Sequence, residues 1–433
     1  MASKTKRPVL GTRALNRATL ARQLLLTRAE MSAQDATRHL LGLQAQNVKP
    51  PYFQLHARLA GFGPAELAGL MESRQVVRMV TMRSTIHTHT VDDALTLRPL
   101  VQPARDREIN YFRKGLVGVD LDRLAERARV FVEAEPRTMA EIREELLKEW
   151  PGADPQSLSV AARCRLPLVQ VTPRGVWGKS GQVRLTTLSQ WVGGDGGAGG
   201  EGGGSGGEGS GAGGEGSGID DAVLRYLGAF GPASVKDMQT WAGLTRLREA
   251  FERLRPVLEV FQDENGVELF DLPDGPRPDA GQPAPPRFLP EFDNLLLSHA
   301  DRSRVIAPEL KGSTWTGNQA HCTLLLDGFL AGLWKLDGGT GGGTGGGTGG
   351  GTGSGKGGGT LTVELFSAVS KADKAEIVAE GERLLAEMGA GAAGEGPAGE
   401  GPAGEGRAGG SGSDSVSVTG SGSGSVRFGS IRA

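Results

Sequence analysis

Residues 138–178 read TMAEIREELLKEWPGADPQSLSVAARCRLPLVQVTPRGVWG, and this stretch decides the fold that the sequence predicts. It opens with Thr138-Met139-Ala140-Glu141, a capping box in which a hydroxyl and a carboxylate three residues apart satisfy the first amides of a helix. Near its end, the turn-forming Pro173-Arg174-Gly175 separates two short strand-like runs. With the helical spacing just upstream, we predict helices over 121–133, 138–150 and 156–165, then strands over 168–172 and 176–178.

The same order of helices followed by paired strands recurs on both sides of this stretch. Downstream, a copy begins at Ile219, uses Ser234-Val235-Lys236-Asp237 as a helix cap, and ends in a hairpin turned at Glu264-Asn265-Gly266. Upstream, the copy is longer and ends in two strands that pair around Arg83-Ser84. Its predicted helices lie near 17–28, 32–42, 52–60 and 64–72.

Three helices followed by a two-stranded wing is the layout of a winged helix, a helix-turn-helix variant that commonly grips DNA. Tandem winged helices also serve as protein-interaction modules, and the pattern alone leaves both uses open. The strand-like runs after the third copy, CTLLLDGFLAGLWKLD and TLTVELF, indicate a hairpin whose strands flank an expanded glycine-rich loop. We therefore predict an α+β chain with three tandem winged-helix domains followed by a small β-rich C-terminal domain.

Three glycine-rich tracts interrupt the 433-residue chain, which holds 70 glycines. Such tracts bury too little apolar surface to offset the entropy of ordering them, so we treat them as flexible insertions.

The remaining segments divide the chain into domains. We expect the strand-like end SVRFGSIRA to fold back onto the folded part of the chain. The predicted divisions are winged helix 1 over 1–118, winged helix 2 over 119–192, a linker over 193–218, winged helix 3 over 219–285, a β-rich domain over 286–388 with a glycine-rich loop at 338–359, and a mostly disordered tail over 389–433.

Charge is distributed unevenly along the chain. Residues 1–192 carry 29 Lys and Arg against 18 Asp and Glu, whereas residues 193–433 carry 19 against 32. The amino-terminal half alone therefore has the electrostatic character of a polyanion binder. An arginine-rich solvated surface is the alternative that charge alone leaves open.

The two cysteines, Cys164 and Cys322, lie far apart and outside any metal-binding spacing. The amino terminus lacks an apolar signal segment, and no stretch of 18 apolar residues occurs. We expect a cytoplasmic, nucleoid-associated monomer with no cofactor, no metal and no membrane partner.

The segment HLLGLQAQNVKPPY, residues 39–52, places two amides around a small apolar residue where a helix stops. In an extended stretch Gln44 and Gln46 point the same way, so two uncharged donor-acceptor groups can converge on one target. The alternative is that both amides only satisfy backbone groups before Pro50-Pro51.

Three motifs carry a family resemblance: LQAQ at 43–46, RSTIH at 83–87 and LPEFDNLLLSHADRSR at 289–304. With them the sequence resembles the AlkZ/YcaQ family of bacterial DNA glycosylases. The resemblance implies tandem winged helices curved around duplex DNA, with Gln44 and Gln46 as catalytic residues. A Gln-x-Gln motif is that of the AlkZ-like branch, some members of which remove bulky adducts or unhook interstrand crosslinks in antibiotic producers.

The chemistry of the glutamine pair narrows the substrate. Glutamine has no titratable proton near neutrality, so Gln44 and Gln46 cannot act as general acids. Purines alkylated at N7 or N3 are already cationic and leave as neutral bases, so they need no acid. We predict monofunctional hydrolysis of cationic alkylpurines in double-stranded DNA, with the amides orienting water and substrate.

Other polar residues of the family motifs are candidates for the DNA interface. We predict that Arg83, Thr85, His87, Arg302 and Arg304 contact DNA, phosphates above all. For Thr85 and His87, which share one strand face, the alternative is that this face packs against the domain. A metal site at His87-x-His89 would need a third ligand that the sequence does not offer. A supporting polar network, either inside the fold or at a DNA-facing edge, is predicted at Asp293, Asn294 and His299.

Two other functions compete with the enzyme. A winged-helix transcription regulator would use the basic half for DNA and the acidic half for a partner. The glycine-rich tracts suggest a structural or interaction protein. Neither has a use for the Gln-x-Gln motif, which favours the glycosylase.

Overall fold

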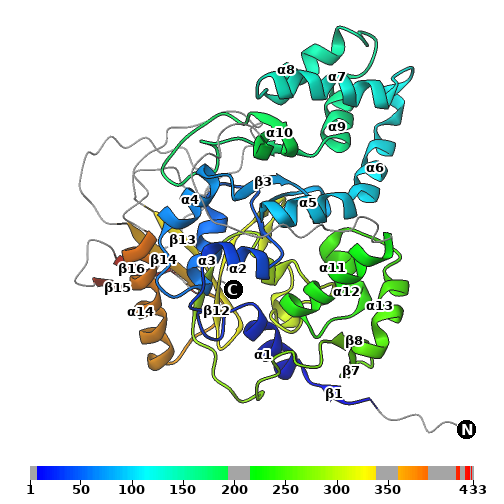
Figure 1. Cartoon of the computed structure of the whole chain (residues 1–433). Coiled ribbons are helices and arrows are strands. Elements are labelled where there is room, and N and C mark those ends of the chain that lie inside the picture. Colours follow the sequence, from blue (N-terminus) through cyan, green and yellow to red (C-terminus); the bar gives the residue numbers. More distant parts are fainter. Residues whose placement is uncertain are drawn as a thin grey trace, which may run out of the picture.

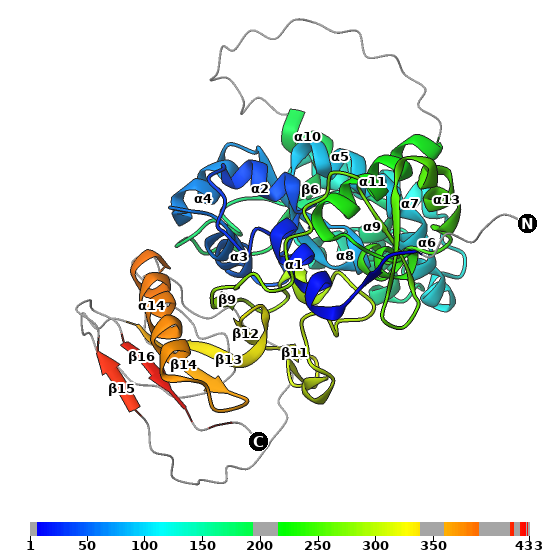
Figure 2. The same ribbon diagram turned by 90° about the horizontal axis from the view of Figure 1, so that it is seen from below.

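The computed structural model describes residues 7–193, 215–337, 359–388, 416–419, 425–429 and 431. Helices and short sheets alternate along these ranges, which confirms the predicted α+β class. The helical elements form most of the body, and one sheet with its helix lies to one side (Figures 1 and 2). The predicted linker and carboxyl-terminal tail fall largely outside the described residues.

The first unit contains the predicted helices and the predicted strand pair. Ser32 caps α2 by accepting from the amide of Asp35, and prolines open α3 and α4, where a missing amide costs nothing. Helix α1 lies earlier than predicted and stops before Leu24, whose φ of 57° is left-handed. The elements are α1 (Thr12–Arg22), α2 (Ala33–His39), β2 (Leu43–Gln44), α3 (Pro50–Arg58), α4 (Pro64–Glu72), β3 (Val76–Val80), η1 (Met82–Ser84), β4 (Ile86–Thr90), α5 (Val91–Leu100), α6 (Gln102–Tyr111) and η2 (Arg113–Leu116).

The second unit confirms the capping box, since Thr138 and Glu141 bond reciprocally to each other's backbone amides. The strand predicted over 176–178 is wrong, because that segment is a turn in which Val176 donates to the carbonyl of Pro173. Gly175 and Gly178 both have positive φ there, which bends the chain away from the sheet. The partner strand is β6. The elements are α7 (Leu121–Ala134), α8 (Met139–Leu147), α9 (Pro155–Arg165), β5 (Leu168–Gln170), β6 (Leu185–Thr187) and α10 (Leu188–Gly193).

The third unit confirms the cap at Ser234 and the hairpin turned at Glu264-Asn265-Gly266. The amino-terminal strand β1 (Val9–Leu10) joins this hairpin by pairing parallel with β7. The start of the chain is thereby tied to a unit more than 250 residues away. The remaining elements are α11 (Glu215–Phe230), α12 (Val235–Ala242), α13 (Arg248–Leu254), η3 (Arg255–Val257), β7 (Glu259–Asp263) and β8 (Glu268–Asp271).

The carboxyl-terminal unit is a six-stranded sheet in the order β15-β16-β14-β13-β12-β9, with α14 packed against it. Strands β13 and β14 pair antiparallel, and the glycine-rich residues 338–358 between them lie outside the described residues. The end of the chain returns as predicted, because β16 pairs parallel with β14. The elements are β9 (Arg287–Leu289), η4 (Asn294–Leu296), η5 (Pro308–Leu310), β10 (Trp315–Thr316), β11 (Gln319–Ala320), β12 (Cys322–Leu326), β13 (Phe329–Asp337), β14 (Thr360–Leu365), α14 (Lys371–Met388), β15 (Val416–Thr419) and β16 (Ser425–Phe428).

A five-stranded sheet connects the first two units and holds the glutamine motif. Its order is β2-β4-β3-β5-β6, so the hairpins of both units share one sheet. Strand β2 pairs antiparallel with β4, which sets Gln44 opposite His87. None of the described helices is long and apolar enough to cross a membrane.

Candidate active site

Gln44 lies at the end of the short strand β2 and is almost fully buried, with 3% of its surface exposed. Its carbonyl accepts a hydrogen bond of 2.9 Å from Nε2 of Gln54 on α3. The strand is preceded by Gly42 at a φ of 93°, and a Cβ there would lie 2.3 Å from Nδ1 of His89. Only glycine can therefore bring the chain this close to β4 before Gln44.

Arg83 fixes the side chain of Gln44. Nη2 of Arg83 donates to Oε1 of Gln44 at 2.6 Å. Since a guanidinium has donors and no acceptor, the Gln44 atom facing it must be the amide oxygen. The amide NH2 of Gln44 is therefore left to face other partners.

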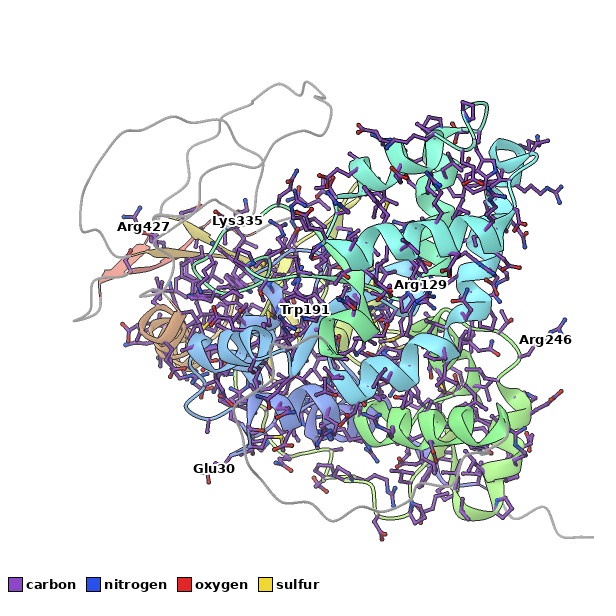
Figure 3. The ribbon with its side chains drawn as sticks, turned by 45° about the horizontal axis from the view of Figure 1, so that its top comes forward. Glu30, Arg129, Trp191, Arg246, Lys335 and Arg427 are labelled. Atoms are coloured by element: carbon purple, nitrogen blue, oxygen red, sulfur yellow. The ribbon has the colours of Figure 1, made fainter. Side chains whose placement is uncertain are left out.

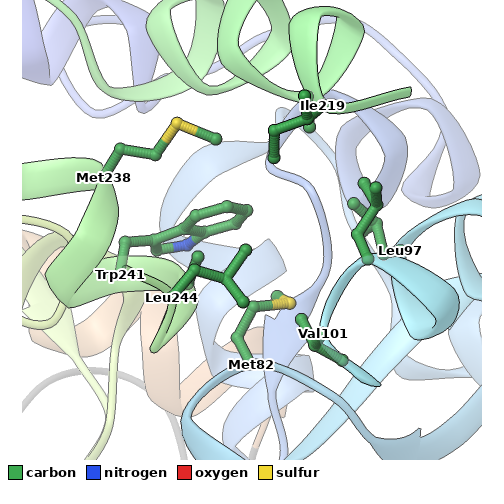
Figure 4. A pocket seen from close by; sticks show the side chains of 10 residues that line it. Met82, Leu97, Val101, Ile219, Met238, Trp241 and Leu244 are labelled. Carbon is green, nitrogen blue, oxygen red and sulfur yellow. The ribbon is translucent and has the colours of Figure 1, made fainter. Parts of the chain in front are cut away.

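The turn that carries Arg83 is held through contacts of Met82 and of Arg83 itself. Met82 lines a small apolar pocket together with residues of α5, α11 and α12, among them Leu97, Ile219 and Trp241 (Figure 4). Arg83 itself donates to the carbonyl of Trp241 and has a left-handed φ of 52°. Residues with such a backbone need their surroundings to hold them, and these contacts do so.

Arg83 also contacts a pair of histidines on β4, His87 and His89, through His87. The rings of His87 and His89 are stacked with centroids 5.6 Å apart, and Oγ1 of Thr81 lies within hydrogen-bond distance of both, 3.1 Å from Nδ1 of His87 and 2.9 Å from Nε2 of His89. Burial, then the positive charge of Arg83, lowers the pKa of His87 well below its usual range. Arg83 donates to Nε2 of His87 at 3.4 Å, which assigns the proton of the neutral ring to Nδ1.

Gln46 is exposed, in contrast to Gln44. Its Oε1 accepts a long hydrogen bond of 3.5 Å from the amide of Ile86, while the amide of Ala45 donates to the carbonyl of Ile86 at 2.7 Å. The backbone between and beyond the two glutamines is held by Arg78, which donates to the carbonyls of Ala45 and Asn47. The glutamine pair thus combines one fixed, buried amide with one accessible amide.

Two arginines of the site, Arg78 and Arg83, form no ion pair with a carboxylate among the described residues. Arg78 and Arg83 bond only to neutral acceptors in the described part of the chain. Burial lowers the pKa of each to about 10, and the charge of Arg302 contributes at Arg83. Such uncompensated cations beside an accessible amide favour an anionic ligand such as a phosphate.

The sequence profile of one family, the AlkZ-like DNA glycosylases, matches residues 37–386. This chain belongs to the AlkZ-like DNA glycosylase family. The match covers the glutamine motif, the Arg83 turn and the 289–304 block, and confirms the family resemblance predicted from those motifs. Membership supports DNA glycosylase activity with DNA as the substrate.

Among solved structures, the chain is similar to the DNA glycosylase AlkZ of Streptomyces sahachiroi. The two share 18% sequence identity over 89% of this chain and 98% of that one, with a TM-score of 0.66. At this identity the likeness shows a common fold. No curated protein matches the sequence.

The structure brings several of the predicted family residues together at Gln44. Arg83 contacts both Gln44 and His87, and Thr85 closes the turn by donating to the carbonyl of Met82. Oδ1 of Asn294 accepts from the backbone N–H of Gln44 at 3.4 Å. Asn294 also donates to the carbonyl of Gly42 at 2.7 Å. Asn294 therefore supports the strand that carries Gln44.

Three other predicted residues have their hydrogen-bonding partners inside the fold. Asp293 forms a two-bond ion pair with Arg58, and both side chains are fully buried. His299 bonds the carbonyl of Phe230. Arg304, also buried, donates to Thr19 and to the carbonyl of Pro232.

Sequence reasoning missed Arg78, Asn47 and Glu291. The sequence held a signal for Arg78, because a charged residue inside the apolar strand VVRMV needs buried hydrogen-bond partners. Asn47 and Glu291 had none, since their 2.9 Å contact joins segments 244 residues apart. Within the described ranges, no group of three or more His, Cys, Asp or Glu residues could hold a metal ion.

Proposed function

We propose that this family member hydrolyses the N-glycosidic bond of purines made cationic by alkylation at N7 or N3 in duplex DNA. Bulky adducts and interstrand crosslinks are included in the proposed range. The observation that carries the proposal is the Arg83–Gln44 hydrogen bond beside the accessible Gln46. Among the described residues, neither glutamine side chain is hydrogen-bonded to a carboxylate.

The two glutamines take different parts in this proposal. Because Oε1 of Gln44 is engaged by Arg83, Gln44 offers its NH2 group to an oxygen of the lesion's sugar or of a phosphate. Gln46 is exposed and keeps accepting capacity on its oxygen, so it orients the attacking water. The water oxygen bonds to C1′ as the C1′–N bond breaks. The bonding electrons neutralise the cationic base, and the proton of the water passes to solvent.

This division explains why the substrate must be charged. A neutral purine would leave as an anion unless an acid protonated it, and an amide has no proton to give near neutrality. A cationic purine needs no such proton. We therefore propose monofunctional hydrolysis that leaves an abasic site, with no cofactor.

The surroundings of the glutamines fit a phosphate backbone. Arg83 is partly exposed, and Arg302 is half-buried beside it without a carboxylate partner in the described residues. Arg246 adds a further exposed cation in the α12–α13 loop, and its side chain projects away from the body (Figure 3). We propose that the three helix-and-strand units act as winged helices around chromosomal DNA in the cytoplasm, with the enzyme as a monomer.

The test is excision of 7-methylguanine from duplex DNA under single-turnover conditions. Gln44→Ala and Gln46→Ala are each expected to lower the rate about 100-fold or more, by loss of one oriented amide. Gln190→Ala, an exposed glutamine on α10, is the matched control and should keep the wild-type rate. Equal rates for all four proteins would refute the assignment of the glutamine pair.

A further inference from the structure

Asn47, the residue after Gln46, is tied to a carboxylate from the far end of the sequence. Its Nδ2 donates to Oε1 of Glu291 at 2.9 Å. Glu291 is buried, with 5% of its surface exposed, and its other oxygen accepts from Sγ of Cys322 at 3.1 Å. We propose that Glu291 is a positioning residue, which fixes Gln46 by holding Asn47.

Gln46 needs such support because its own contacts are weak. Its side chain is exposed, and the 3.5 Å hydrogen bond to the amide of Ile86 is at the limit of hydrogen-bond geometry. After Asn47 the chain has no regular structure until α3 begins at Pro50. The hydrogen bond from Asn47 to the Glu291 carboxylate is of the charge-assisted kind, which is stronger than bonds between neutral groups.

Glu291 itself is rigidly held. Two residues on, Asp293 forms its buried ion pair with Arg58. Phe292, between Glu291 and Asp293 in the sequence, has a left-handed φ of 61°. Its ring packs edge-on against Trp315, with ring centroids 5.6 Å apart. A bulky residue keeps that backbone only when its surroundings impose it. Burial and the nearby Glu291 raise the pKa of Cys322 well above its usual range, so its thiol stays protonated as a donor.

One short segment therefore supports both glutamines. Oδ1 of Asn294 accepts from the backbone N–H of Gln44, and Glu291 accepts from the side chain of Asn47, the residue after Gln46. The segment belongs to the carboxyl-terminal half of the chain, whereas the glutamines lie near the start. Its fixed spacing therefore constrains the stretch of backbone that carries both glutamine side chains.

The inference rests on the proposed glycosylase function and is tested by the kinetics of two single variants and their double variant. Glu291→Ala and Asn47→Ala should each lower the single-turnover excision rate of 7-methylguanine about tenfold to 100-fold, because misplacing a group by about 1 Å costs that much. The affinity for the same DNA should change less than about twofold. The double variant should be no slower than the slower single variant, since both substitutions remove the same contact.

The conservative variant Glu291→Gln separates positioning from charge. Its amide oxygen can still accept from Asn47, so it should recover a rate within about threefold of wild type. The outcomes that overturn the inference are a Glu291→Gln enzyme as slow as Glu291→Ala, additive losses in the double variant, or a wild-type rate for Asn47→Ala. Asn47 is exposed, so its substitution removes the contact without opening the core.

Hydrogen exchange gives a readout that does not depend on activity. Backbone amides of residues 44–49 should exchange faster in both alanine variants than in wild type and in the control Glu309→Ala, an exposed glutamate of the same half. Unchanged exchange in Glu291→Ala refutes the positioning role. If wild type excises no lesion, the proposed function fails, and the exchange comparison still decides whether Glu291 orders this segment.

Discussion

Nη2 of Arg83 lies 2.6 Å from Oε1 of Gln44, and this contact joins the turn between β3 and β4 to the glutamine motif. It orients the Gln44 amide before any DNA arrives. A preorganised donor costs no rearrangement during the reaction, which is the usual source of electrostatic catalysis in enzymes.

Arg83→Ala should therefore affect both catalysis and DNA binding. We expect the excision rate to fall about 100-fold, because Gln44 loses its orienting partner. We also expect the slope of log affinity against log salt to become shallower by about 1, since Arg83 is a partly exposed cation. A reduced rate with an unchanged slope would show that Arg83 acts only inside the protein. A wild-type rate would refute its role in orienting Gln44.

Arg302 and Arg304 are two residues apart, but their substitutions should affect different properties. Loss of Arg302 should weaken the salt dependence of DNA binding, and loss of Arg304 should lower stability. Arg302→Ala should flatten the salt dependence of DNA binding by about 1 while leaving the melting temperature nearly unchanged. Arg304→Met should destabilise the fold by about 2 kcal/mol, because the buried guanidinium holds Thr19 and the carbonyl of Pro232. Salt titrations, thermal melts and denaturant unfolding of both variants check these two predictions, and a flatter salt slope in Arg304→Met would contradict the second.

Asp293→Asn should mainly cost stability. The substitution leaves the fully buried Arg58 without its anion, and breaking a buried ion pair in this way costs about 3–5 kcal/mol. Urea unfolding measures the loss. Asp301→Asn, which alters an exposed carboxylate of the same block, serves as the control. A loss below about 1 kcal/mol in Asp293→Asn would show that the ion pair does not stabilise the contact between α3 and the 289–304 block.

Lowering the pH should destabilise the fold, because buried histidines become protonated on unfolding. Burial lowers the pKa of His89 to about 4 from 6.5, so between these values the unfolded chain binds a proton that the folded chain does not. Protonation thus favours unfolding, and the free energy of unfolding should drop by up to about 3 kcal/mol for this group as pH falls through that interval. His89→Gln should reduce the slope of stability against pH, whatever its effect at neutral pH. An unchanged slope would contradict the shift.

The rate of excision should depend on the charge of the lesion and little on pH. 7-Methylguanine should be released at a constant rate between about pH 6.5 and 9, because neither glutamine titrates and the pKa of His87 lies well below this range. Uracil and 1,N6-ethenoadenine, which are neutral, should remain in the DNA. Efficient release of either base, or a bell-shaped pH profile, would require an acid that the proposed mechanism lacks.

The sequence by itself determined the α+β class, most helix starts and the family. Capping boxes at Thr138 and Ser234 and the turn at Glu264-Asn265-Gly266 depend on residues a few positions apart, so their chemistry is visible locally. The motif Gln44-Ala45-Gln46 is also local, and with the two other motifs it led to the family that the profile match shows. The strand predicted over 176–178 was wrong because the sequence shows a turn but not how far the chain travels before it pairs again.

Only the tertiary structure decided how the motifs work together. In the fold, Arg83 bonds Gln44, and the side chains of Arg304 and Asp293 are buried. Glu291 bonds Asn47, which lies 244 residues earlier in the chain. Each of these outcomes depends on which side chains become buried against distant partners. A polar side chain excluded from water must find a partner or destabilise the fold, and packing chooses that partner from the whole chain. The sequence thus pointed to the two glutamines that we propose as catalytic, and the fold determined that the side-chain oxygen of Gln44 is the atom that bonds Arg83.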